Sequence, residues 1–285
     1  MKVGIQLFSV KEALAKNPKG TLKQVADLGY KYLEPFANPL PGDESTFGLQ
    51  MPLEEAKAFL KENGLQVVGA HYYPLGCEAF EEFCNYYKEL GAEQVGSGGA
   101  HFPGGREDVL EKCQLMAHDA AIAEKCGLKY YYHNHYREYQ EFDGEQIIQI
   151  IMDNTPETVR YELDTFWAAR GGVDPVQELE RWSSRLIPLM HQKDFSKSAR
   201  VPVNIWEYTR MDFPISKDFD QPTRLLELYV EVGTGLLPIQ DYIDAGNKAG
   251  IQYVLLEQDK TQIGEMESIK VSMEAFRKFH GTEWE

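Results

Sequence analysis

The sequence predicts an α/β fold of the (β/α)8 TIM barrel type, and three observations support this prediction. Short apolar runs alternate with longer helical stretches, and the strand–helix unit can be counted eight times. Four helical stretches end in a glycine that is followed almost at once by an apolar strand, in DLGYKYLE, ENGLQVVG, KCGLKYYY and KAGIQYVLLE. No GxGxxG motif follows the first strand, which argues against a dinucleotide-binding fold.

The first four units begin with strands expected at residues 3–8, 30–36, 65–73 and 92–99. The first strand, VGIQLF, leads into a helical stretch that ends at DLGY. The second is followed by a polar loop and by PLEEAKAFLKENG, where Pro52 suits a first helical turn and Gly64 a C-terminal cap. The third precedes CEAFEEFCNYYKELG. The fourth precedes REDVLEKCQLMAHDAAIAEKCG, in which Leu110, Cys113 and Met116 share one helix face.

The last four units begin with strands expected at residues 128–135, 159–166, 185–194 and 251–259. Their helices are predicted by GEQIIQIIMDN, VDPVQELERWSS, LPIQDYIDAGNKAG and MESIKVSMEAFRKFHG. The seventh unit carries an insertion at about 195–234, rich in proline, aspartate and aromatic residues, between its strand and its helix. No interdomain linker interrupts the pattern, so residues 1–285 are predicted to form a single domain.

Composition excludes several classes of function. The formal net charge of −16 argues against a nucleic-acid partner, because binding a polyanion normally needs a basic face. No window approaches the roughly 18 consecutive apolar residues of a membrane span, and the N-terminal segment MKVGIQLFSVKEAL does not resemble a secretory signal. The four cysteines show no CxxC spacing, so we expect reduced thiols in a cytoplasmic protein.

Polar residues gather where the predicted strands finish, which is where TIM barrels carry their chemistry. The residues at these strand ends are Glu34, His71, His133, Asn134, His135, Asp164, His191, Lys193, Asp194, Glu257, Gln258 and Asp259. Among them, His133 and His135 lie at i and i+2 and share one face of an extended strand. By themselves they could bind a metal, bind a polar ligand, or simply cap the strand.

Four of these strand-end residues form a candidate metal site: His133, Asp164, His191 and Glu257. A mixed set of imidazoles and carboxylates suits Mn²⁺, Zn²⁺, Co²⁺ or Fe²⁺ better than Mg²⁺ or Ca²⁺. We expect one divalent ion, with Mn²⁺ first and Zn²⁺, Co²⁺, Fe²⁺ or Mg²⁺ as alternatives. Such a site leaves room for neighbouring oxygens of a hydroxycarbonyl substrate, whose enediolate the ion would stabilise while a carboxylate moves the proton.

The pieces IQLFSV, YKYLEPF, YHNH…E, ELDTFW, LMHQKD, EVGTG and LLEQD resemble the sugar phosphate isomerase/epimerase family with the xylose isomerase-like barrel. The resemblance runs over essentially the whole chain and implies the barrel fold, a divalent metal and a sugar-like substrate. It carries metal ligation onto Asp164, His191 and Glu257. Relatives often read E-N-H where this chain reads H-N-H, so His133 takes the position of the fifth-strand glutamate, with Glu138 as the alternative ligand.

This departure affects the expected chemistry. Relatives that epimerise ketoses use two metal-bound carboxylates on opposite sides of the substrate, and only Glu257 clearly keeps that role here. The sequence therefore suggests Glu257 as a catalytic base and His71 or His135 as the proton donor.

Four further residues are candidates for substrate binding: Glu34, Glu138, Trp167 and Lys193. For Glu34 a salt bridge that seals the barrel top is an equal alternative, and for Trp167 it is core packing. Lys193, two residues past His191, would lie on the same face of the strand and hold an anionic or hydroxyl group.

The sequence is compatible with three functions. The first is a metal-dependent isomerase or epimerase acting on a sugar, keto-sugar or inositol derivative. The second is a metal-dependent lyase or dehydratase acting on a 3-keto-sugar or related polyol, and the third is a non-catalytic carbohydrate-binding barrel. Metal-dependent phosphodiester cleavage fits poorly, because strand-end histidines are few and the net charge is negative. A homo-oligomer is compatible with the sequence.

Overall fold

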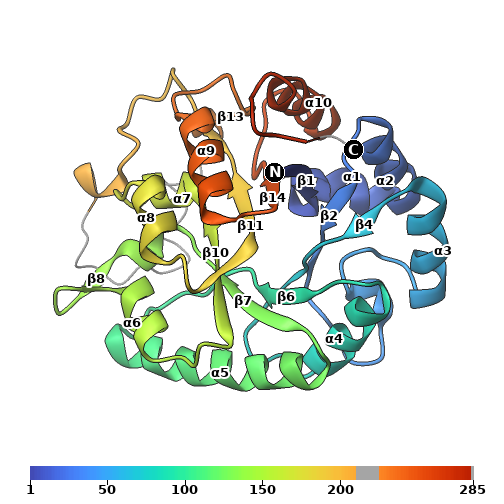
Figure 1. Cartoon of the computed structure of the whole chain (residues 1–285), viewed down its shortest axis with the longest axis horizontal. Helices are drawn as coiled ribbons and strands as arrows, with labels where there is room; N and C mark the ends of the chain where they lie inside the picture. The colour runs from blue at the N-terminus through green and yellow to red at the C-terminus, as the bar shows by residue number, and fades with distance from the viewer. Residues whose placement is uncertain (210–224, 284–285) are drawn as a thin grey trace.

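Parallel strands curl into a barrel surrounded by helices in the computed structural model, which describes residues 1–209 and 225–283 (Figure 1). The strands of the barrel sheet are β1 (Lys2–Gln6), β2 (Tyr32–Glu34), β3 (Phe36–Ala37), β4 (Gln66–Val67), β5 (His71–Tyr72), β6 (Gln94–Ser97), β7 (Lys129–His133), β10 (Val159–Asp164), β11 (Leu186–Gln192) and β14 (Tyr253–Leu256). The fold class predicted from the sequence is confirmed.

The ten segments of this sheet occupy eight barrel positions, because two predicted strands are each split in two. The strand expected at 30–36 is broken at Pro35 into β2 and β3, and the strand expected at 65–73 becomes β4 and β5. The halves still run side by side, since β2 pairs with β4 and β3 pairs with β5. β1 pairs with both β14 and β2, which closes the barrel.

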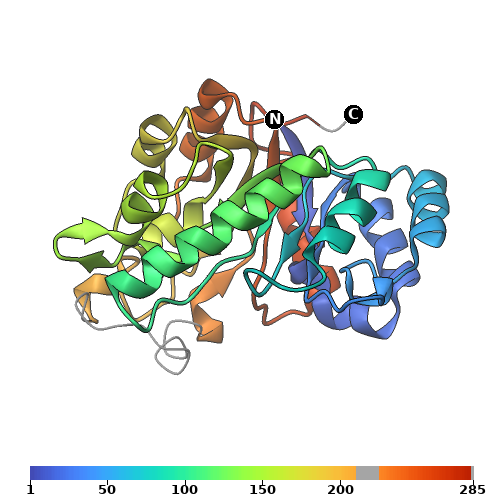
Figure 2. The same ribbon diagram turned by 90° about the horizontal axis from the view of Figure 1, so that it is seen from below.

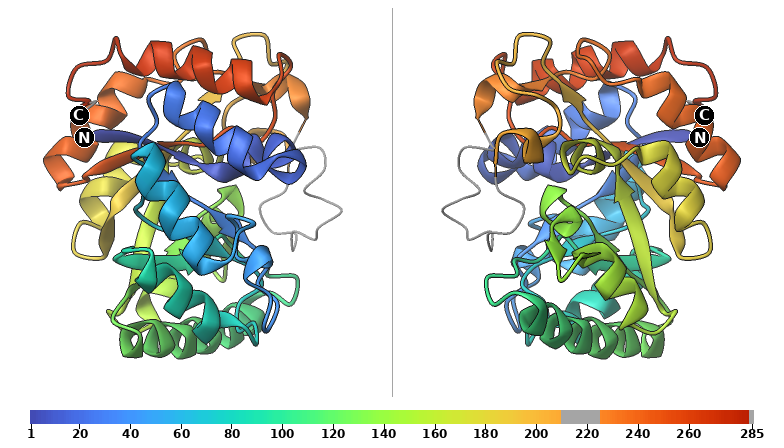
Figure 3. Two further views of the ribbon diagram at one scale, coloured as in Figure 1. Left: turned by 90° about the vertical axis from the view of Figure 1, so that its right-hand side faces the viewer. Right: turned by 90° about the vertical axis from the view of Figure 1, so that its left-hand side faces the viewer.

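The helices cover the outside of the barrel, as the two side views show (Figure 3). They are α1 (Lys11–Lys16), α2 (Pro18–Asp27), α3 (Leu53–Asn63), α4 (Phe80–Glu89), α5 (Arg106–Lys125), α6 (Ile147–Asp153), α7 (Thr165–Arg170), α8 (Pro175–Arg181), α9 (Ile239–Ala249) and α10 (Glu265–Phe276). The longest, α5, crosses one side of the molecule (Figure 2). Gly64 ends α3 with φ +64°, as the sequence predicts.

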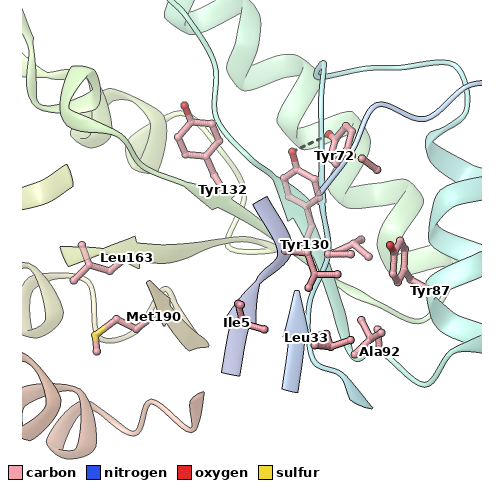
Figure 4. Close-up of a cluster of buried hydrophobic side chains, with 14 of the residues drawn as sticks. Ile5, Leu33, Tyr72, Tyr87, Ala92, Tyr130, Tyr132, Leu163 and Met190 are labelled. Atoms are coloured by element: carbon pink, nitrogen blue, oxygen red, sulfur yellow. Dashed lines mark hydrogen bonds between the residues drawn. The ribbon is translucent and has the colours of Figure 1, made fainter. Parts of the chain in front are cut away.

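Side chains alternate between the two faces of each barrel strand. On β7, Tyr130 and Tyr132 point outward into the main core under the helices, where the Tyr130 and Tyr72 hydroxyls lie 3.1 Å apart (Figure 4). Tyr131 points inward and packs in a smaller cluster that fills the barrel interior. Gly69 and Gly96 make room for it, because a Cβ at either position would collide with the Tyr131 side chain.

A second small cluster lies over the C-terminal ends of β7, β10 and β11. Its members are Tyr136, Phe166, Trp167, Phe195, Ile205, Leu228 and Tyr229. Phe195, Ile205, Leu228 and Tyr229 of this cluster belong to the predicted insertion at 195–234. At the start of the insertion, β12 (Asp194–Phe195) pairs antiparallel with β13 (Tyr229–Val230). Residues 210–224 of the insertion lie outside the described part of the chain. A short hairpin, β8 (Glu141–Phe142) and β9 (Glu145–Gln146), precedes α6.

The first residue lies beside the segment that follows α10, where the Met1 amino group donates to the Gly281 carbonyl at 2.7 Å. The described residues also form short 3-10 turns: η1 (Leu7–Val10), η2 (Glu44–Thr46), η3 (Tyr136–Tyr139), η4 (Ile205–Glu207) and η6 (Leu226–Leu228). All four cysteines are free thiols. Among the described residues, none of the helices is long and apolar enough to span a membrane.

Candidate metal and active site

Four side chains from successive strand ends come together at the C-terminal mouth of the barrel. His133 ends β7, Asp164 ends β10, His191 lies near the end of β11, and Glu257 follows β14. Each offers one nitrogen or oxygen atom, and these atoms all lie within 4.8 Å of one another. All four side chains are buried. We call this set the outer group, and it is the set that the sequence predicts as metal ligands.

Asp164 uses one carboxylate oxygen to bind the backbone and turns the other toward the outer group. Its Oδ1 accepts a hydrogen bond from the Trp167 backbone N–H at 2.8 Å and so caps α7. Its Oδ2 faces the other members, 3.8 Å from Nε2 of His133 and 3.9 Å from Nδ1 of His191. Asn134, between the two histidines of the HNH motif, accepts the Asp164 backbone N–H at 2.9 Å and ties β7 to β10. The middle residue of the motif therefore positions Asp164.

Lys193 lies inside the outer group. Its ammonium contacts Oδ2 of Asp164 and Oε2 of Glu257, and it lies 5.7 Å from the centre of the Trp167 ring. Burial acts to lower the pKa of Lys193, but Asp164 and Glu257 outweigh burial and raise it. The ammonium therefore balances part of the negative charge of the two carboxylates.

Beneath the outer group lies a second polar layer that the sequence interpretation largely missed. We call Glu34 and Glu162 the inner carboxylate pair; both are fully buried. Glu34 accepts hydrogen bonds from the Tyr131 hydroxyl at 2.5 Å and from Nε2 of Gln6 at 2.9 Å. Oε2 of Glu162 lies 2.7 Å from Nε2 of His71.

Two groups of the inner layer have strongly shifted pKa values. Burial acts to raise the pKa of Glu34, but His71, His191 and the Tyr131 hydroxyl lower it to about 2. Burial and the charge of Glu34 raise the pKa of Glu162 to about 7. Burial acts to lower the pKa of His71, and the inner carboxylate pair outweighs it and raises that pKa.

The two histidines of the outer group differ electrostatically. His191 lies between carboxylates, with Nδ1 2.9 Å from Glu257 and Nε2 2.5 Å from Glu34. Burial acts to lower its pKa, but Glu162, Glu34 and Glu257 together raise it well above its ordinary value. Burial, with His191 and His71 nearby, holds the pKa of His133 well below its ordinary value. His133 is therefore a neutral imidazole at physiological pH.

The two carboxylates of the outer group also differ. Burial acts to raise the pKa of Glu257, but Lys193 and His191 hold it well below its ordinary value. Burial raises the pKa of Asp164, against the opposing effect of Lys193. Glu257 is therefore ionised across the physiological range.

The remaining predicted site residues surround the outer group. His135 is half-buried, with its ring 5.1 Å from that of His133 and 5.4 Å from Trp167. Glu138 accepts the Tyr132 hydroxyl at 2.6 Å and the His135 backbone N–H at 2.7 Å, and it is in neither candidate metal group of the described residues. Trp167 is fully buried in the cluster over the strand ends.

Glu162, Gln6 and Tyr131 were missed because they lie within runs that look like ordinary strands. The missing signal was the period-two alternation of strand side chains. Glu162 stands two residues before Asp164, and Tyr131 two before His133, so each shares the inward face of its neighbour. Asp194, by contrast, accepts backbone N–H groups of Phe195, Gly233, Gly235 and Leu237 and organises the EVGTG loop.

The residues present fit a divalent cation. Four buried carboxylates face one ammonium and three imidazoles, so potential oxygen and nitrogen ligands outnumber the one permanent positive charge. Nδ1 of His133 and Oε1 of Glu162 are buried, and neither has a hydrogen-bond partner among the described residues. A second set of four donors, from His71, His133, Glu162 and His191, is also close enough to surround an ion. The site thus offers two overlapping donor sets that share two imidazoles.

Solved structures of similar fold span nearly the whole chain. A sugar phosphate isomerase/epimerase from Parabacteroides distasonis is 19% identical, with a TM-score of 0.74, over 99% of this chain and 95% of that one. The probable 3-DHS dehydratase AsbF from Bacillus anthracis is 11% identical, with a TM-score of 0.71, over 98% and 99% of the two chains. The IolI protein, solved with a bound zinc atom, is 14% identical, with a TM-score of 0.67, over 96% of each chain.

At these identities the structures establish the fold alone. No curated protein sequence gives a significant match. Residues 22–279 match the xylose isomerase-like TIM barrel family. That match covers most of the chain and agrees with the resemblance seen in its motifs, so this protein belongs to the xylose isomerase-like TIM barrel family.

Proposed function

We propose that this protein is a divalent-metal-dependent enzyme that transfers a proton next to the carbonyl group of a sugar, keto-sugar or inositol derivative, as isomerases and epimerases do. The observation that carries the proposal is the outer group, in which two imidazoles and two carboxylates from four strand ends place their donor atoms within 4.8 Å of one another. Membership of the xylose isomerase-like family supports a small sugar-like substrate. The formal net charge of −16 argues against binding to nucleic acids.

The outer group has the donor chemistry for one ion of the Mn²⁺, Zn²⁺, Co²⁺ or Fe²⁺ type, with Mn²⁺ the first choice. Bound there, the ion would supply Lewis-acid stabilisation of the negative charge that develops on the substrate's carbonyl oxygen. His133 is suited to ligation because its imidazole stays neutral. Asp164 is suited because its helix cap fixes the carboxylate orientation.

Glu257 is the proposed base. It is 8% exposed, more than the other members of the outer group, and its contacts with His191 and Lys193 all use Oε2. The ionised carboxylate takes the proton from the carbon beside the carbonyl, and the C–H electron pair moves to form the enediolate. Return of that proton to the former carbonyl carbon, together with transfer of the neighbouring hydroxyl proton to the former carbonyl oxygen, gives the isomer.

Lys193 and His135 are the proposed polar contacts of the substrate. The Lys193 ammonium can hold a substrate hydroxyl or share its proton with a departing oxygen, because it already lies beside the base. Of the two histidines predicted as proton donors, His135 is the better placed, since it is half-buried beside His133. His71 lies deeper, with its Nε2 on Glu162.

A lyase or dehydratase is the second candidate, and the presence of His133 favours it. A neutral imidazole stands where a second carboxylate would be needed to exchange protons across the substrate. With Glu257 as the one clear base, the proton leaves and returns on one face. If the carbanion instead expels a β-hydroxyl group, which takes a proton from Lys193, the products are an unsaturated ketone and water.

The test is proton exchange in D₂O with Mn²⁺-loaded protein and a panel of ketoses and 3-keto-sugars, followed by NMR. We expect deuterium to enter at the carbon beside the carbonyl, and we expect Glu257→Gln to slow exchange by about 10²-fold or more. Glu178→Gln, a buried carboxylate on α8, is the control and should exchange normally. Appearance of an alkene signal would assign the lyase. Binding without exchange on every substrate would contradict catalysis and leave a carbohydrate-binding barrel.

Metal content by mass spectrometry tests the ligands separately. We expect about one transition-metal ion per chain in the wild type, and loss of the ion in both His133→Ala and Asp164→Ala. Retention of the ion in His133→Ala would move the first ligand elsewhere, with Glu138 the alternative. Absence of an ion after reconstitution of the wild type would contradict the metal-dependent proposal.

A further inference from the structure

The inner carboxylate pair contacts the far side of each imidazole of the outer group. Nδ1 of His191 faces Glu257 at 2.9 Å, and its Nε2 faces Oε2 of Glu34 at 2.5 Å. His133 has the opposite orientation: its Nε2 faces Asp164 at 3.8 Å, and its Nδ1 faces Oε2 of Glu162 at 3.4 Å. Each ring therefore has one nitrogen toward the outer group and one toward a buried carboxylate.

Glu34 is held rigidly in this position. Besides His191, it accepts the Tyr131 hydroxyl on Oε1 and the Gln6 side-chain amide on Oε2. Gln6 is itself fixed, because its Oε1 accepts the Phe8 backbone N–H at 3.0 Å. A carboxylate oxygen accepts and does not donate when ionised, so Nε2 of His191 must carry hydrogen.

Two polar atoms that lack partners mark the contact between Glu162 and His133. Nδ1 of His133 and Oε1 of Glu162 are both buried without a hydrogen-bond partner among the described residues. Leaving such a buried atom unpaired is destabilising. Oε2 of Glu162 lies 3.4 Å from Nδ1 of His133, so a small shift of the ring toward it would give Nδ1–H an acceptor, while Oε1 of Glu162 lies 3.4 Å from Nε2 of His191.

The alternative is an ion held in the inner donor set of His71, His133, Glu162 and His191, and the Gln6 amide argues against it. Because Oε1 of Gln6 is occupied by Phe8, the Gln6 nitrogen is the atom that faces Nδ1 of His71, at 3.2 Å. That nitrogen donates, so Nδ1 of His71 accepts and Nε2 carries hydrogen. A protonated Nε2 donates to Glu162 and offers no lone pair to an ion.

We propose that Glu34 and Glu162 are positioning residues that hold the two imidazoles of the outer group in opposite tautomers, Nε2–H in His191 and Nδ1–H in His133. When a divalent cation in the outer group displaces the hydrogen on Nδ1 of His191, the lone pairs of His191 Nδ1 and His133 Nε2 both point toward that cation. The carboxylate behind each ring also increases the ligand basicity. This inference rests on the metal-dependent function proposed above, and it adds the residues that prepare the ligands.

The test measures ion affinity and tautomer rather than turnover. Zn²⁺ binding to the full chain is measured by competition with a chromophoric chelator, for the wild type, Glu162→Gln and Glu34→Gln. We expect both variants to bind Zn²⁺ about 10–100-fold more weakly, and we expect Glu178→Gln, the buried control, to bind as the wild type does. Because Gln keeps the size of Glu, unfolding curves should show that both variants remain folded.

Tautomers are read from ¹⁵N-histidine NMR spectra of the Zn²⁺-loaded wild type, assigned with His133→Gln and His191→Gln. The expected result is ligation through Nε2 of His133 and Nδ1 of His191. Ligation of both rings through the same type of nitrogen, two ions per chain, no Zn²⁺ binding, or wild-type affinity in Glu162→Gln would each overturn the inference. Tight Zn²⁺ binding with these tautomers but no proton exchange on any substrate would leave it standing while contradicting the proposed function.

Discussion

At the scale of single residues, the site combines a positive charge with the groups expected to bind a positive ion. The Lys193 ammonium contacts Asp164 and Glu257, which are two of the four members of the outer group. Asp259 lies 4.0 Å from the same ammonium. Lys193 therefore competes with a cation for the same carboxylates, and its charge should lower ion affinity while serving the substrate.

Replacing Lys193 by methionine separates these two effects. We expect Lys193→Met to bind Mn²⁺ about tenfold more tightly or better, because a like charge within a few Å of the ion is removed. Proton exchange on the substrate should fall in the same variant. Ion affinity is measured by titration followed by paramagnetic relaxation. Lys88→Met, an exposed lysine that donates to the Gly127 carbonyl, is the control. Weaker Mn²⁺ binding in Lys193→Met would show that Lys193 supports the ion instead.

Ion binding should also depend on pH through His191. Its folded pKa is raised well above the ordinary value, so below that pKa the ring is protonated and Nδ1 has no lone pair to offer. Binding must release this proton, and apparent affinity should rise about tenfold per pH unit while His191 is protonated. Mn²⁺ titrations between about pH 6 and 7.5 test this, with exposed His280→Gln as the control. An affinity that does not change with pH would contradict a protonated His191.

At the scale of elements, backbone-binding carboxylates align the strand ends. Asp194 follows β11 and uses both oxygens: Oδ1 accepts from Phe195 and Leu237, and Oδ2 from Gly233 and Gly235. A Cβ at Gly235 would collide with that carboxylate, which explains the glycine in EVGTG. These hydrogen bonds therefore hold the loop before α9 against the end of β11, the strand that carries His191.

Asp194→Asn should weaken this attachment. The new amide NH₂ would face two backbone N–H donors, which removes two charge-assisted hydrogen bonds and leaves two donors unpaired. We expect a loss of about 3 kcal/mol in the free energy of unfolding, measured by urea denaturation, with faster hydrogen exchange at residues 231–237. Asp174→Asn, at the start of α8, keeps a single cap and should change stability little. Equal effects in the two variants would contradict this account.

At the scale of the whole molecule, the sequence predicts the barrel and places the four residues of the outer group at strand ends, because both depend on short-range patterns. Eight strand–helix units follow from glycine-terminated helices and apolar runs, and Asp164, His191 and Glu257 directly follow such runs. The inner layer could not be placed in the same way. The contact of Glu34 with His191 joins residues 157 apart in the chain, so it depends on barrel closure rather than on local sequence.

Because the outer group joins four strands, an ion bound there should stabilise the whole barrel. Binding to the folded chain alone at about 100 times the Kd adds about 2.7 kcal/mol, which raises Tm by about 5 °C or more for a chain of this size. Asp164→Asn should remove most of this Mn²⁺-dependent rise, because asparagine retains the helix cap on Trp167 but loses the ligand charge. Asp174→Asn keeps the cap of α8 in the same way, lies outside the outer group, and should show the full rise. Scanning calorimetry with and without Mn²⁺ measures the difference. An equal rise in both variants would mean that the ion stabilises the protein from a site that does not include Asp164.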